Sequence, residues 1–105
     1  RTDDEFKRGE GRVTLFDAAT GKPSKSFRLG KDDTTIGRGD ACTIKLPVAS
    51  VSKEHAKVEY KLGTFIITDL QSANGVLVNG RVVRRASLKD GHVLQLGEAI
   101  LRIDC

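Results

Sequence analysis

Hydrogen-bonding side chains of the kind used in active sites gather in two short stretches. Arg38 follows a glycine in "TTIGRGD", and Ser52, Lys53 and His55 occur together in "VSKEH". A serine and a histidine can form a nucleophile and a base, but this chemistry also needs a group that orients the base. The chain has neither a Gly-x-Ser-x-Gly motif nor an acidic pair, so we expect it not to be an enzyme.

Other short motifs do not indicate a cofactor or a metal. The "GKPS" segment lacks the spacing of a phosphate-binding loop, and Arg38-Gly39-Asp40 is interpreted as a tight turn rather than an adhesion motif. Cys42 and Cys105 have no CxxC or histidine-rich company, which indicates neither a metal site nor a disulfide framework. A reducing, intracellular compartment is therefore expected.

The composition is that of one globular domain with a basic excess. The 105 residues are 38% hydrophobic, which suits a single core, and the net charge is +4 with the two signs intermixed. No apolar run is long enough to span a membrane, and the start lacks the apolar core of a signal peptide. We expect residues 1–10 to be a flexible charged tail and 11–105 a domain excised from a longer protein.

Short runs of alternating apolar residues, separated by turn signals, predict about ten strands. The runs are "RVTLF", "KSFRL", "TTIG", "TIKL", "AKVEY", "TFIITDL", "VLV", "RVV", "HVLQL" and "AILRI". Asn79-Gly80 is the strongest hairpin signal, because both residues tolerate the positive φ of a type I′ turn. No segment keeps a helical apolar period. The pattern predicts an all-β fold, a two-sheet antiparallel sandwich with its loops gathered at the two ends.

Three motifs together resemble the forkhead-associated (FHA) domain, a reader of phosphothreonine peptides. They are Gly37-Arg38 after a strand, Ser52-x-x-His55 in the next long loop, and Asn74-Gly75 after "DLQSA". The similarity extends from about residue 12 to 105. The resemblance implies an eleven-stranded FHA/SMAD-like sandwich that binds its peptide through loops at one end. By analogy it also implies nuclear residence and a part in DNA-damage or cell-cycle signalling.

The resemblance implies that Arg38, Ser52 and Lys53 contact the phosphate and that Asn74 binds the peptide backbone. Phosphothreonine carries close to two negative charges and three acceptor oxygens, so a forked guanidinium, a hydroxyl and an ammonium suit it. The amide of Asn74 has both a donor and an acceptor, which allows it to clamp the main chain of an extended peptide. The expected partner is thus a protein or peptide that contains phosphothreonine.

The remaining motif residues are expected to support the site or to select the peptide. Gly37 would allow a sharp turn that aims Arg38 outward, Gly75 would fix the turn beside Asn74, and the resemblance implies that the ring of His55 holds the loops. The residues expected to read the peptide after the phosphothreonine are Val48, Ala49, Ser50, Val51, Gln71, Ser72 and Ala73. Many family members have Thr or Ser at the position of Ala73, so a lower affinity is expected here.

Charged residues indicate two further candidate partners, a second copy of the chain and nucleic acid. Thr2 precedes three acidic residues, so a phosphorylated Thr2 would be able to enter the Arg38 site of a second copy. Arg81, Arg84 and Arg85 raise the alternative of a basic nucleic-acid-binding sandwich, which is disfavoured because no aromatic residue is interleaved among them. A structural docking domain of the same fold, without dependence on phosphate, is the remaining alternative.

Overall fold

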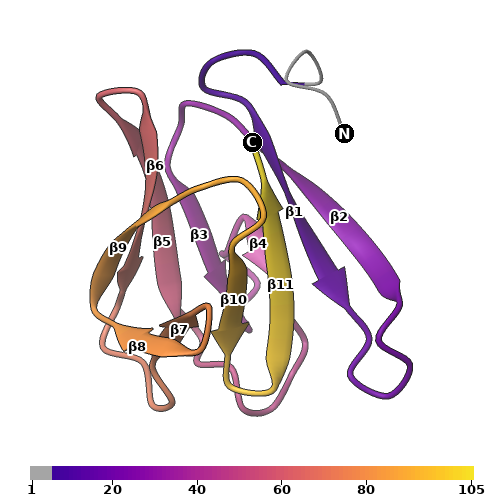
Figure 1. The fold of residues 1–105 in the computed structure, drawn as a ribbon. Helices are drawn as coiled ribbons and strands as arrows, with labels where there is room; N and C mark the ends of the chain where they lie inside the picture. The colour runs from indigo at the N-terminus through magenta and orange to yellow at the C-terminus, as the bar shows by residue number, and fades with distance from the viewer. Residues whose placement is uncertain (1–5) are drawn as a thin grey trace.

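The structure is a computed structural model that describes residues 6–105, and this part of the chain forms eleven strands without a helix (Figure 1). The strands are β1 (Gly11–Phe16), β2 (Pro23–Leu29), β3 (Thr34–Gly37), β4 (Ile44–Lys45), β5 (Ala56–Lys61), β6 (Thr64–Asp69), β7 (Val76–Val78), β8 (Arg81–Val83), β9 (Arg85–Leu88), β10 (Val93–Leu96) and β11 (Ala99–Asp104). The prediction of an all-β fold is confirmed. With no helix in residues 6–105, this segment offers none that could cross a membrane.

Two sheets form the sandwich. One has six strands in the order β2-β1-β11-β10-β7-β8, and the other has five in the order β4-β3-β5-β6-β9. The pairs are antiparallel except β3 with β4, which run parallel through Ile36 and Ile44. This pair departs from the antiparallel pattern expected from the sequence. The ten strands expected from the sequence do not include β9, which pairs with β6.

The core lies between the two sheets and follows from the alternation of the strands. Inward residues of successive strands face the opposite sheet, while their neighbours face solvent. The fully buried large residues of the strands are Val13, Val76, Leu94, Leu96, Leu101 and Ile103 from the six-stranded sheet, and Ile36, Ile44, Val58 and Ile67 from the five-stranded sheet. Burial of each contributes about 1.5–3 kcal/mol relative to leaving it exposed, so this core is the main source of stability.

Strand direction brings three loops to one end of the sandwich. Ile36 near the end of β3 pairs with Ala56 at the start of β5, and Ala56 pairs with Asp69 at the end of β6. The loops 38–43, 46–55 and 70–75 therefore leave the five-stranded sheet together, at the lower end in Figure 1. These loops contain the residues that the sequence analysis assigns to the site.

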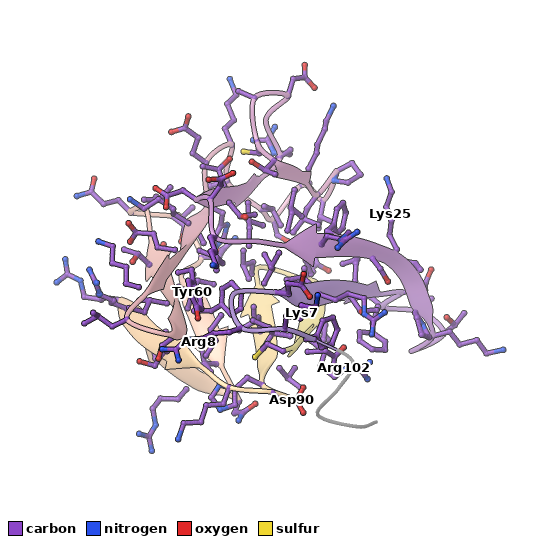
Figure 2. All side chains as sticks on the ribbon, turned by 90° about the horizontal axis from the view of Figure 1, so that it is seen from above. Lys7, Arg8, Lys25, Tyr60, Asp90 and Arg102 are labelled. Carbon is purple, nitrogen blue, oxygen red and sulfur yellow. The ribbon has the colours of Figure 1, made fainter. Side chains whose placement is uncertain are left out.

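The other end of the sandwich contains the described part of the expected tail. The main-chain N–H of Lys7 donates to the Glu10 carboxylate, and Gly9 is buried against the side chain of Lys31. Figure 2, seen from this end, shows Lys7, Arg8, Tyr60 and Asp90, which line a cavity of about 400 Å³. Residues 6–10 thus contact the domain, whereas Thr2 lies outside the described residues.

Replacing Leu101 by Ala tests the position of the core. Leu101 has no exposed surface, so the shortened side chain leaves a cavity, and we expect the free energy of unfolding to fall by about 2–5 kcal/mol in a urea titration. Val82→Ala is the matched control, because Val82 is 71% exposed, and its effect should stay within about 0.5 kcal/mol. Equal effects of the two changes would contradict the described packing.

Candidate functional site

The ring of His55 is completely buried and connects two of the three loops. Its Nδ1 accepts the main-chain N–H of Ser52 at 3.0 Å, and its Nε2 lies 2.7 Å from the carbonyl oxygen of Gly75. Since the N–H of Ser52 can only donate, Nδ1 carries no proton, and Nε2–H donates to the carbonyl. The main chain of His55 also bonds to Ile36 and Leu70, which anchors the residue in the sheet. His55 is therefore a supporting residue.

The loop that carries Arg38 is bonded to the loop that carries Ser52. The N–H groups of Arg38 and Gly39 donate to the carbonyl oxygens of Ser52 at 2.9 Å and Lys53 at 3.0 Å. The guanidinium Nε of Arg38 donates to the carbonyl of Val51 at 2.9 Å. This contact orients the side chain, which is exposed, and leaves its two terminal nitrogens available for an anion.

Gly37 is required by the close approach of these two loops. A Cβ at this position would lie 2.2 Å from the carbonyl oxygen of Lys53, which also accepts a hydrogen bond from Cys42 Sγ at 3.0 Å. Its φ is not in the left-handed region. The reason for the glycine is thus steric, and not the sharp turn that the sequence analysis expects.

The hydroxyl of Ser52 and the side-chain amide of Asn74 each form a hydrogen bond between the 46–55 and 70–75 loops. Ser52 Oγ accepts the N–H of Ala73 at 3.0 Å, so the hydroxyl hydrogen is left to donate in another direction. Asn74 Nδ2 donates to the carbonyl of Ser50 at 2.7 Å, and its Oδ1 is left as an acceptor. Although Ala73 has no hydroxyl of its own, its main chain fixes the hydroxyl of Ser52.

The turn around Asn74 is held by its own neighbours. The N–H of Ser72 donates to the carboxylate of Asp69 at 3.0 Å, and the Ser72 hydroxyl accepts the N–H of Gly75 at 2.9 Å. Gly75 has a φ of 76° and Gln71 a φ of 58°, both in the left-handed region. The glycine removes the steric cost of that conformation at the residue whose carbonyl His55 binds.

Ser50 lies at a junction that the sequence analysis does not anticipate. Its carbonyl accepts from Asn74, and its hydroxyl accepts the N–H of Glu98 at 2.7 Å, in the turn between β10 and β11. A Cβ on Gly97 would lie 2.4 Å from the Ser50 carbonyl oxygen, so the turn closes directly against this loop. The glycine of "LGEA" is the signal in the sequence, but it is equally explained by the hairpin alone.

The residues expected to read the peptide differ in exposure. Ala49 and Gln71 are exposed, and Val48 is half-buried. The side chain of Val51 is only 1% exposed and belongs to the core, so its contribution to the site is the carbonyl that holds Arg38. A peptide on this surface would therefore meet small and polar side chains.

The three loops contain two cations, Arg38 and Lys53, and two acids, Asp40 and Glu54. The side chains of Arg38 and Lys53 are exposed. The nearby acid Asp40 is bonded to Lys45, whose hydrogen bond and charge hold the pKa of that carboxyl below its ordinary value. Asp40 is thus an ion-pair partner for Lys45.

The arrangement does not form a nucleophile and base. His55 binds the main-chain N–H of Ser52 rather than its hydroxyl, and both ring nitrogens have main-chain partners. Within residues 6–105, no cluster of three or more His, Cys, Asp or Glu residues is suited to a metal ion. What the loops offer is a set of hydrogen-bond donors around an exposed arginine.

Comparisons with known proteins give one family. A family model described as "FHA domain" matches residues 34–97. FhaA of Mycobacterium tuberculosis is 33% identical over 81 residues, covering 75% of this chain. The human mediator of DNA damage checkpoint protein 1 is 36% identical over 70 residues, covering 65% of the chain. The matched regions are 15% and 3% of those two proteins, so the chain spans a small part of its relatives' length.

Solved structures agree with the sequence matches. One, from a study of phosphothreonine-dependent FHA domain interactions, has a TM-score of 0.81 with 28% identity, covering 91% of this chain and 96% of its own. The FhaA domain, complexed with the intracellular domain of a second protein, has a TM-score of 0.78 with 29% identity, covering 89% and 98%.

Replacing Gly37 by Ala tests the close contact between the loops. The added carbon must push the Lys53 carbonyl away, so we expect a loss of about 1–3 kcal/mol in the free energy of unfolding. Gly30→Ala is the matched control, because no atom lies within 4 Å of a Cβ there and its φ is not positive. If urea titrations gave both variants wild-type stability, the packing of Gly37 against Lys53 would be wrong.

Proposed function

Because the chain belongs to the FHA family, we propose that it is a non-enzymatic module that binds phosphothreonine in partner proteins through Arg38, Ser52, Lys53 and Asn74. The observation that supports this assignment is the arrangement of the loops around His55. The main chain of these loops is internally bonded, while an arginine, a lysine, a hydroxyl hydrogen and the side-chain oxygen of Asn74 remain for a ligand.

Each side chain has a distinct part in the proposed complex. The terminal nitrogens of Arg38 donate to two phosphate oxygens, the Ser52 hydroxyl donates to the third, and Lys53 adds a mobile charge. Hydrogen bonds to a charged group contribute about 1.5–3 kcal/mol each. Asn74 exchanges its bond to the Ser50 carbonyl for bonds to the peptide main chain. Recognition thus combines the phosphate with an extended backbone.

Threonine is proposed to be preferred over serine. Its γ-methyl group would be buried against the loops, which contributes about 0.8 kcal/mol, and its β-branched side chain has fewer rotamers to lose. Selection after the phosphothreonine falls to the exposed residues near Ala49 and Gln71. Neither is charged, so no strong requirement for an acidic residue is proposed there.

The proposed setting is signalling assembly in the nucleus, in DNA-damage or cell-cycle responses. Its support is the similarity to the human DNA-damage checkpoint mediator. FhaA of a bacterium is similar to the same degree, so the setting rests on analogy to one branch of relatives. Localisation of the tagged full-length protein before and after DNA damage tests it, and exclusion from the nucleus in both conditions would contradict it.

A second copy of this chain is also proposed as a binding partner. Thr2 lies in an acidic stretch suited to an acidophilic kinase, and its phosphate would enter the Arg38 site of another molecule. We expect light scattering to show a doubled mass after phosphorylation in the wild type but not in Thr2→Ala. An unchanged mass of the phosphorylated wild type would end this part of the proposal.

Replacing Arg38 by Ala tests the proposed function. The variant loses the charged donors to the phosphate, so affinity for a phosphothreonine peptide should fall about tenfold to a hundredfold in a calorimetric titration. Arg28→Ala is the matched control, because Arg28 is also an exposed cation but lies on the edge strand β2. Its affinity should be that of the wild type. Equal binding of phosphorylated and unphosphorylated peptide by the wild type would refute the proposal.

A further inference from the structure

A second cavity lies where the edge strands of the two sheets meet. It has a volume of about 350 Å³ and is lined by Val78, Asn79, Arg81, Val83, Ala86, Ser87 and His92. The strand β8 is the edge of one sheet and β9 the edge of the other, and Figure 1 shows them on the same side of the molecule. The cavity therefore lies outside the loops of the proposed phosphothreonine site.

Arg81 belongs to the inner face of its strand. It pairs with Val78 across the β7–β8 ladder, and directly paired residues project to the same side of a sheet. Val78 is 9% exposed and packs in the core. The side chain of Arg81 is exposed and lines the cavity, so this cation lies at the gap between the sheets.

Existing hydrogen bonds leave the polar groups of the cavity as donors. Asn79 Oδ1 accepts the N–H of Val93 at 2.8 Å, so the amide nitrogen of Asn79 is left to donate. His92 Nδ1 accepts the N–H of Lys89 at 3.2 Å, which places a proton on Nε2. With the guanidinium of Arg81 and the hydroxyl of Ser87, the cavity has four groups able to donate.

Arg81 is the charged residue that lines this cavity. None of the seven lining residues is acidic; the exposed Arg84 connects β8 to β9, and the exposed Arg85 begins β9. Several donors around a cation, without a carboxylate, are the complement of a phosphoryl group. Val78, Val83 and Ala86 form the apolar part of the wall of this open pocket.

The chain connects this cavity with the first site over a short distance. Asn74 comes shortly before the three-residue strand β7, and Asn79 follows it, so five residues at about 3.3 Å each, or at most about 17 Å, separate the two. The carbonyl of Arg84 accepts the N–H of Asp69 at 2.8 Å, which places Arg84 beside the start of the 70–75 loop. An extended peptide of about five residues would reach from one site to the other.

We propose that the cavity of Arg81, Asn79, Ser87 and His92 binds a second phosphoryl group, about five residues from the phosphothreonine of the same client protein. The assignment of the client rests on the proposed function, whereas the complementarity to a phosphoryl group does not. A nucleic-acid backbone is the less favoured source, since the cavity has no Phe, Tyr or Trp ring on which a base would stack.

Peptides with one or two phosphates, five residues apart, test the proposal by fluorescence anisotropy. In the wild type the second phosphate should raise the affinity about tenfold, because the second contact is intramolecular. Arg81→Gln should reduce this gain to less than about twofold and leave the affinity for the singly phosphorylated peptide unchanged. Arg28→Gln, which removes the same charge elsewhere, is the control and should keep the full increase in affinity, about tenfold. A full gain in Arg81→Gln would overturn the proposal.

An NMR titration with inorganic phosphate separates this inference from the function of the first site. Shifts of the His92 ring and Asn79 amide signals that disappear in Arg81→Gln would support the cavity, even if no phosphothreonine peptide bound at all. Absence of those shifts in the wild type would overturn it. If duplex DNA displaced the phosphate and the doubly phosphorylated peptide did not, the assignment to a protein client would be wrong.

Discussion

The buried ring of His55 is the contact on which the binding loops depend. Its two nitrogens bind the N–H of Ser52 and the carbonyl of Gly75, which belong to loops far apart in the sequence. The carbonyl oxygen of Ser52 in turn accepts the N–H of Arg38, so Ser52 also connects the loop of Arg38 to the two loops that His55 joins. Loss of the ring would leave two half-buried main-chain groups without these partners, at a cost of up to about 1–3 kcal/mol each.

In this arrangement main-chain groups hold the loops together, and several side-chain donors are left for a ligand. The loops are held chiefly by their own main-chain groups, which leaves the terminal nitrogens of Arg38 and the hydroxyl hydrogen of Ser52 for a ligand. Because the loops that carry these donors are already bonded to one another, binding of a phosphate as proposed would require little further ordering of the loops. The same arrangement explains why a neighbouring serine and histidine do not form a catalytic pair.

Much of the fold could be predicted from local sequence, whereas most of the misses have non-local causes. Alternation and turn residues indicate ten strands, but β9 (Arg85–Leu88) has only Ala86 and Leu88 as its apolar positions. The parallel pairing of β3 with β4 has no local signal. The bond between Ser50 and Glu98 joins residues 48 positions apart, and the steric need for Gly37 arises from Lys53 in another loop. Such contacts depend on the folded chain and cannot be predicted from spacing.

The proposed function requires that the three loops joined through His55 present their donors to a phosphate. An NMR titration of the isotope-labelled protein with a phosphothreonine peptide tests it most directly. We expect the signals of residues 38–39, 52–53 and 73–75 and the side-chain amide of Asn74 to shift only with the phosphorylated peptide, while those of the Leu62-Gly63 turn stay unchanged. Identical shifts with the unphosphorylated peptide, or shifts confined to the opposite end of the sandwich, would contradict the account.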